Sequence, residues 1–155
     1  MLRHALAVLL LPFVVTVIVP AILLNQFGAG QPALWQQAGG GLVFAAGFSL
    51  FAWCVALFVR VGRGTLAPWD PTTALVAVGP YRYVRNPMIS GVTAMLAGEA
   101  LYFGSAALGV WCLAVVLLNH VYFVYTEEPG LEQRFGEPYR QYKAAVPRWL
   151  PRLRR

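Results

Sequence analysis

Uncharged apolar runs dominate this chain. No Asp, Glu, Lys or Arg occurs between Arg3 and Arg60, and Glu99 is the only such residue between Arg85 and Glu127. A helix that spans a bilayer needs about 20 mostly apolar residues, and uncharged stretches this long cannot all belong to one soluble core. The pattern therefore predicts an all-α integral membrane protein.

Four segments resemble transmembrane helices in length and composition. They comprise residues 5–24, 42–59, 89–103 and 107–125. Gly104 and Ser105 separate the last two segments. Because these residue types can turn the chain, we expect helices three and four to form a tight hairpin. Helix three is short for a full span, which indicates a tilted or partial crossing.

Composition and charge agree with this prediction. Apolar residues make up 59% of the chain and charged residues only 12%, against roughly 25% charged residues in an average soluble domain. With four spans, all Lys and Arg residues lie on one side, which the positive-inside rule makes cytoplasmic for both termini. We therefore expect a multi-pass protein of a bacterial inner (plasma) membrane. Anionic membrane lipids account for the net charge of +6 without a nucleic-acid partner.

We expect a single membrane domain over residues 1–155. Residues 1–71 would supply the two N-terminal transmembrane helices, and residues 72–151 the functional part. The first apolar run is longer than the h-region of a secretory signal and is not followed by a clear cleavage site. Cys54 and Cys112 fall inside predicted spans, and their spacing matches no zinc or redox motif, so we expect packing roles and no metal.

The C-terminal segment has a different pattern. Glycine and proline residues at positions 136, 138 and 147 bound two short helical stretches. In the second stretch, Tyr139, Tyr142 and Val146 share one face, and Arg140 and Lys143 lie on the other. This pattern is typical of an interfacial helix that lies on the bilayer.

A polar motif borders the third apolar run. Residues 79–91 read GPYRYVRNPMISG; an apolar helix ending in EE follows about forty residues later, and then FGEPYRQYKAAVPRWLP. In this order and spacing, the segments resemble the isoprenylcysteine carboxyl methyltransferase family and the related phospholipid methyltransferases, over roughly residues 72–151. The resemblance implies a membrane enzyme that uses S-adenosylmethionine. It would methylate a lipophilic or lipidated acceptor, on a carboxylate or similar group, at the cytoplasmic membrane face.

The resemblance also implies how the cofactor is held. In the family, an arginine-x-proline segment and a downstream glutamate bind the cofactor. Here Glu127 would accept hydrogen bonds from it, and Arg85, the expected catalytic residue, would donate to its carboxylate or to an acidic substrate. Pro87 biases Asn86 away from helical geometry, which can leave nearby backbone groups free to meet the ligand. The expected cofactor-binding set, whose first three members would wall the cofactor, is Leu75, Val76, Tyr81, Arg85, Asn86, Pro87, Glu127 and Glu128.

Simpler roles fit several of these residues. Arg82 and Arg85 also suit positive-inside anchors, with Tyr81 and Tyr83 as an aromatic belt, and residues 126–128 suit a helix cap with first-turn acids.

Two residues outside the motifs have equally open roles. Glu99, the only acid within a predicted span, is either functional or a residue of the far interface. His120 lies about two turns before Glu127, and it either approaches the site or satisfies a neighbouring helix.

Three positions depart from the family pattern. Asn86 replaces a histidine, Ile89 replaces a tyrosine, and Phe123 occupies the place of an arginine proposed to face the substrate in the eukaryotic carboxyl methyltransferases. The alternatives are a phosphatidylethanolamine-type N-methyltransferase, a non-catalytic membrane protein, and a sterol-reductase-like NADPH enzyme, although such reductases usually have more spans. Methyl transfer requires mainly alignment and exclusion of water. A carboxylate or thiolate acceptor needs no base, whereas an ammonium would first have to lose its proton, so we assign no general base.

Overall fold

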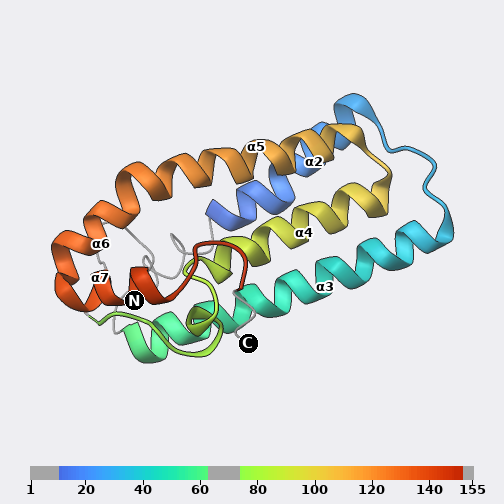
Figure 1. Cartoon of the computed structure of the whole chain (residues 1–155). Helices are drawn as coiled ribbons and strands as arrows, with labels where there is room; N and C mark the ends of the chain where they lie inside the picture. Colours follow the sequence, from blue (N-terminus) through green and yellow to red (C-terminus); the bar gives the residue numbers. More distant parts are fainter. Residues whose placement is uncertain (1–10, 63–73, 152–155) are drawn as a thin grey trace.

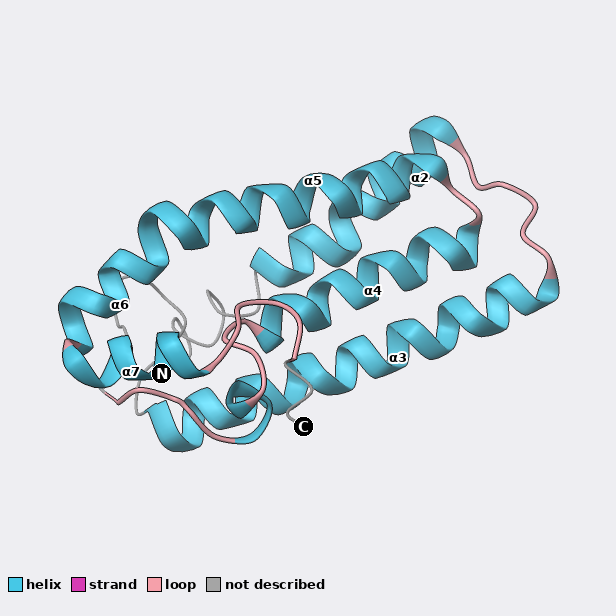
Figure 2. Ribbon diagram, viewed as in Figure 1, coloured by secondary structure: helices cyan, strands magenta, loops and turns pink. Residues whose placement is uncertain are grey.

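A computed structural model describes residues 11–62 and 74–151. In this part of the chain all regular elements are helices, joined by short loops (Figure 2). The all-α prediction is therefore confirmed for the described residues. Residues 5–10 of the first expected helix and residues 72–73 of the expected functional part lie outside them.

Within the described ranges, four helices run alongside one another (Figure 1). They are the helix Leu11–Phe27, α3 (Leu34–Leu57), α4 (Pro87–Phe103) and α5 (Ala106–Tyr122). The first of them contains a π-helical turn (η1, Val14–Ile18) and ends as α2 (Val19–Phe27). α4 packs against both α3 and α5, and α2 packs against α5. Gly104 joins α4 to α5 in a left-handed conformation, with φ of 58°, which glycine adopts without steric cost.

Two helices are long and apolar enough to cross a membrane. They are Leu34–Val61, in which a π-helical turn (η2, Phe58–Gly62) extends α3, and Ala106–Phe135. Many of their large apolar side chains are exposed, such as Leu42 and Val110. An apolar surface of this extent is typical of contact with lipid. The structure therefore indicates a membrane protein, while the number of four spans stays a prediction.

The start of α3 differs from the sequence prediction. This helix begins at Leu34 rather than at residue 42, and the Gln36 side chain accepts a hydrogen bond from the Ala33 N–H at 2.8 Å. Gly40 lies inside the helix, against α4, where an added Cβ would be 2.6 Å from the Gly98 carbonyl oxygen. The run of three glycines is thus part of a helix, because the absence of side chains permits a close approach between α3 and α4.

The fourth apolar helix also extends beyond its predicted end. We expected it to end at Glu127 and Glu128. It instead continues through a π-helical turn (η4, Phe123–Glu127) into α6 (Glu128–Phe135). Pro129 is the second residue after this turn, and the wider turn accommodates a residue that has no N–H and a bulky ring.

The two short C-terminal helices are confirmed. α6 ends before Gly136, which has φ of 60°, and α7 (Glu137–Ala145) ends before the extended Val146 that precedes Pro147. The tyrosine face of α7 packs on the protein, since Tyr139 is 2% exposed and the Tyr142 hydroxyl donates to the Tyr81 carbonyl at 2.7 Å. The expectation that this face lies on the bilayer is therefore wrong.

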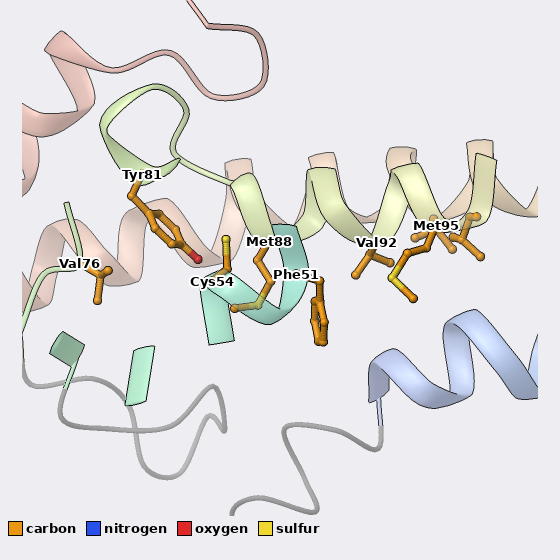
Figure 3. Close-up of a cluster of buried hydrophobic side chains, with 9 residues drawn as sticks. Phe51, Cys54, Val76, Tyr81, Met88, Val92 and Met95 are labelled. Atoms are coloured by element: carbon orange, nitrogen blue, oxygen red, sulfur yellow. The ribbon is translucent and has the colours of Figure 1, made fainter. Parts of the chain in front are cut away.

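A buried apolar cluster joins α3, α4 and the segment before α4 (Figure 3). It contains Cys54, which is fully buried, beside Phe51 and Met88. Cys112 lies half-buried, with its Sγ 3.7 Å from the Thr93 carbonyl oxygen. Both cysteines are free and pack as small side chains, as the sequence predicts.

Candidate functional site

The helices α6 (Glu128–Phe135) and α7 (Glu137–Ala145) lie at the end of the molecule opposite the α4–α5 turn (Figure 1). Here the 3-10 turn η3 (Gly79–Arg82) leads into α4, and α6, α7 and residues 146–151 lie against it. We call residues 146–151 the C-terminal strap. The quoted motif and both C-terminal helices therefore meet at a single site, although about forty to seventy residues separate them in sequence.

Glu128 is the centre of this site. Its side chain is 5% exposed and contacts three basic side chains. The Arg148 guanidinium donates from Nε to Oε1 at 2.6 Å and from Nη2 to Oε2 at 3.0 Å. The Arg85 Nη1 atom lies 3.0 Å from Oε1, and the Lys143 Nζ atom lies 3.6 Å from Oε2. A buried carboxylate requires such partners, because desolvation penalises an unpaired charge.

Arg85 retains hydrogen-bonding capacity beyond this ion pair. Its side chain is 10% exposed, and neither its Nε nor its Nη1 has an aligned hydrogen-bond partner among the described residues. The close Nη1 contact with Glu128 is thus an attraction between charges without favourable hydrogen-bond geometry. Asn86 is 7% exposed, and its Nδ2 is likewise unpartnered within the described ranges. Buried donors of this kind normally have acceptors, so the pair suits an acceptor-rich ligand.

The backbone around Asn86 matches the sequence expectation in conformation but not in hydrogen bonding. Asn86 has the expected non-helical conformation, with φ of −124° and ψ of 53°. However, the strap already accepts the backbone hydrogens, from Arg85 N–H to the Pro147 carbonyl at 2.9 Å and from Asn86 N–H to the Arg148 carbonyl at 3.3 Å. The prediction that Pro87 leaves these groups free is therefore wrong, because a distant segment uses them.

Tyrosines of α7 pack against the site. Tyr139 is buried against the Arg85–Glu128 pair, and burial followed by the charge of Glu128 raises the pKa of its hydroxyl. Burial likewise raises the pKa of Tyr142. Both hydroxyls therefore remain protonated near neutral pH, and that of Tyr142 donates to the Tyr81 carbonyl.

The two adjacent glutamates have different environments. Glu127 is half-buried, and its Oε2 accepts a hydrogen bond from the Tyr122 hydroxyl at 3.3 Å. Glu128, rather than Glu127, faces Arg85. A π-helical turn contains an extra residue, which shifts the direction of the residues that follow. The turn at Phe123–Glu127 thus decides which carboxylate points inward.

The three residues that we expected to line the cofactor site, Leu75, Val76 and Tyr81, lie in or beside the apolar core. Val76 and Tyr81 are both 6% exposed, and Leu75 is half-buried. Figure 3 shows the Tyr81 ring pointing into the core with its hydroxyl toward Cys54. Burial, and then the Cys54 thiol, raises the pKa of this hydroxyl. Pro87 is also buried, at the first position of α4.

His120 contacts the strap. The Trp149 Nε1–H donates to His120 Nδ1 at 3.1 Å, and the Trp149 ring packs edge-on against Phe123 at a centroid distance of 6.0 Å. Because an indole can only donate, His120 must accept at Nδ1 in this contact. The structure therefore gives His120 a role in holding the strap, and Phe123 packs beside it.

Sequence reasoning missed three residues of the site. They are Tyr139, Lys143 and Arg148. All three belong to the segment FGEPYRQYKAAVPRWLP, which supported the resemblance but supplied no site residue. Their signal was the need of a buried glutamate for basic partners, which this segment could satisfy.

The residues present suit S-adenosylmethionine. This cofactor carries a carboxylate, an ammonium and ribose hydroxyls. Arg85 Nε and Asn86 Nδ2 supply hydrogen-bond donors for the cofactor's carboxylate. Glu127, which is more accessible than Glu128, supplies an acceptor for the ammonium or the ribose hydroxyls. Arg85 and Arg148 both contact the single carboxylate of Glu128, while Lys143 is shared between Glu128 and Glu132; the two guanidinium groups also favour an anionic group.

Comparison with protein families gives one match. A family model described as phospholipid methyltransferase matches residues 35–138, which is more than half of the chain. The match includes α3, α4, α5, α6 and the start of α7. Comparisons with curated proteins and with solved structures found no match.

Proposed function

The chain belongs to the phospholipid methyltransferase family, and on that premise we propose that it is an S-adenosylmethionine-dependent methyltransferase of the membrane. It transfers a methyl group to a lipophilic acceptor at the membrane face that borders Arg85. The observation that carries this proposal is the buried Arg85–Glu128 pair with unpartnered donors on Arg85 and Asn86. These donors lie where the apolar helix α4 begins.

Each residue has a defined role in this proposal. Arg85 and Asn86 donate hydrogen bonds to the cofactor carboxylate, and Glu127 accepts from its ammonium or ribose. Glu128 is a positioning residue, because Arg148 and Lys143 already occupy its oxygens and its contact with Arg85 fixes that guanidinium.

The bound cofactor supplies an electrophilic methyl group on a sulfonium. The chain contributes orientation and protection from water. Tyr139 and the strap pack against the cluster, and in this proposal the lipophilic acceptor enters from the membrane. A carboxylate acceptor needs no base, since it is already a nucleophile.

Titration calorimetry with S-adenosylhomocysteine tests the cofactor assignment. We expect the purified wild type to bind, and Arg85→Ala to bind at least about tenfold more weakly, because loss of a charged hydrogen bond costs about 1.5–3 kcal/mol. Asn86→Leu should also weaken binding. Arg82→Ala is the matched control, since Arg82 belongs to the same motif but is exposed.

The same titration separates the other classes of function. Binding of NADPH in place of S-adenosylhomocysteine would identify a reductase-like protein. A well-folded wild type that binds neither compound would contradict the enzyme assignment. Equal effects of Arg82→Ala and Arg85→Ala would indicate general surface electrostatics instead of a site.

A phospholipid amine is the second candidate acceptor. The description of the matched family favours it, and so does Phe123, which stands where the eukaryotic carboxyl methyltransferases have an arginine. Labelled methyl groups transferred to membrane extracts distinguish the two acceptors. Methyl esters release labelled methanol in alkali, whereas N-methylated phospholipids keep the label.

A further inference from the structure

Glu99 lies on α4 toward the end remote from the Arg85 cluster. Its Oε2 atom is buried and has no hydrogen-bond partner among the described residues. Beside it is an open groove of about 310 Å³ between α3 and α4. The groove, which we call the Glu99 pocket, is lined by Gly40, Gly41, Phe44, Gly98, Glu99, Tyr102 and Phe103.

No basic residue of the described chain is placed to neutralise Glu99. The sequence has no Lys or Arg between Arg3 and Arg60, or between Arg85 and Arg134. Both connections at this end, residues 28–33 and Gly104–Ser105, are therefore free of Lys and Arg. A carboxylate in apolar surroundings requires a proton or a cation, and a cation must come from outside these segments.

The lining of the pocket favours one kind of cation. Three aromatic side chains, Phe44, Tyr102 and Phe103, accompany the single carboxyl group. Aromatic faces attract ammonium groups through the ring quadrupole, and a nearby acid adds to that attraction. Glycines form the rest of the lining, so no other side chain fills the space.

The depth of Glu99 in the bundle indicates where the ligand comes from. Glu99 precedes the end of α4 at Phe103 by one turn, which is about 6 Å of helix. In a bilayer whose surface is level with the end of α4, this depth corresponds to the boundary between lipid headgroups and acyl chains. Asn86 lies about 20 Å away along α4, so one headgroup cannot occupy both sites.

From these observations we propose that the Glu99 pocket binds the ammonium headgroup of a phospholipid, in the leaflet opposite the Arg85 cluster. The ammonium contacts the Glu99 carboxylate and the aromatic rings, and the acyl chains lie along the apolar outer surface. This second lipid site is independent of methyl transfer and of cofactor binding.

The chain offers a matched pair of variants that block or spare the pocket. Gly41 lines the pocket, and an added Cβ there meets nothing within 4 Å, so Gly41→Leu fills the space without a backbone clash. Gly39→Leu is the control, because Gly39 is in the same helix, is equally unobstructed and is not part of the lining. Glu99→Gln removes the charge at nearly constant shape, with the exposed Glu137→Gln as its control.

The experiment measures thermal unfolding in detergent with added short-chain phosphatidylethanolamine or phosphatidylcholine, and with phosphatidylglycerol of the same chain length. Ligand-linked stabilisation gives an affinity for each lipid and each variant. We expect the two ammonium lipids to stabilise the wild type, Gly39→Leu and Glu137→Gln more than phosphatidylglycerol does. We expect Glu99→Gln and Gly41→Leu to bind the ammonium lipids at least about fivefold more weakly.

Two results would overturn the proposal. If Glu99→Gln binds the ammonium lipids as the wild type does, the carboxyl simply carries a proton. If phosphatidylglycerol stabilises the wild type as much as the two ammonium lipids do, the Glu99 pocket binds acyl chains and does not select a headgroup. Each comparison is made between lipids within one variant, so a change in basal stability does not affect the result.

Discussion

Arg148 holds Glu128 through two hydrogen bonds, from Nε to Oε1 at 2.6 Å and from Nη2 to Oε2 at 3.0 Å. Twenty residues separate the two side chains in sequence. The contact raises the pKa of Arg148 through the hydrogen bond to Glu128, so the guanidinium remains charged. It links α6 to the strap, and the strap in turn binds the backbone at Arg85 and Asn86.

Replacement of Arg148 should weaken both the fold and cofactor binding. We expect Arg148→Ala to lower the unfolding free energy by about 2 kcal/mol, the usual contribution of hydrogen bonds to a charged group, and to weaken S-adenosylhomocysteine binding because Arg85 loses its fixed position. Thermal unfolding and calorimetry measure the two effects. Arg140→Ala is the control, since Arg140 is exposed and its ion pairs are 3.7 Å long; equal losses in both variants would contradict this role.

The adjacent glutamates should differ in their contribution to stability. Glu128→Gln leaves three basic groups around an uncharged amide, and we expect a loss of about 3 kcal/mol or more. Glu127→Gln changes a half-buried group with one long hydrogen bond, so we expect a loss below about 1 kcal/mol. Unfolding of the two purified variants, side by side, makes the comparison. A larger effect at Glu127 would show that the π-helical turn directs the carboxylates differently.

Close packing between α3 and α4 depends on glycine. An added Cβ at Gly47 would lie 2.6 Å from the Gly91 carbonyl oxygen, and we expect Gly47→Ala to destabilise the protein by about 1–3 kcal/mol through overpacking. Gly109→Ala should be neutral or stabilising by up to about 1 kcal/mol, because nothing lies within 4 Å and alanine is the better helix former. Thermal unfolding of both variants tests this prediction. Equal changes in stability for Gly47→Ala and Gly109→Ala would contradict it.

Buried tyrosines predict a loss of stability in alkali. Burial raises the pKa values of Tyr81, Tyr139 and Tyr142 above the ordinary value of about 10. Above about pH 10 the unfolded chain releases these protons while the folded chain keeps them, so their contribution is complete below that pH and is lost as the pH rises.

Tyr142→Phe tests this pH dependence. It should cost about 1 kcal/mol at pH 8, through the lost bond to the Tyr81 carbonyl, and then show a shallower decline between about pH 10 and 11 than the wild type. Unfolding at a series of pH values measures the slope. Tyr83→Phe is the control at an exposed tyrosine, and a wild-type slope in Tyr142→Phe would refute the explanation.

Local sequence determined the helices and the place where polar groups gather. Apolar composition predicted helices over most of the described spans, and Gly136 and Pro147 marked the ends of α6 and α7. The motif around Arg85 and the EE pair predicted the family, which the family match confirms. These features follow from composition and short-range backbone preference, which every segment carries by itself.

Tertiary structure decided which side chains meet. The π-helical turn before Glu128 selected that glutamate over Glu127, and the strap brought Arg148 to it across 20 residues. The glycines at 39–41 belong to a helix because α4 packs closely against Gly40. Pairing of a buried charge depends on helix register and on contacts between distant segments, and neither is encoded in a local pattern of apolar and polar residues.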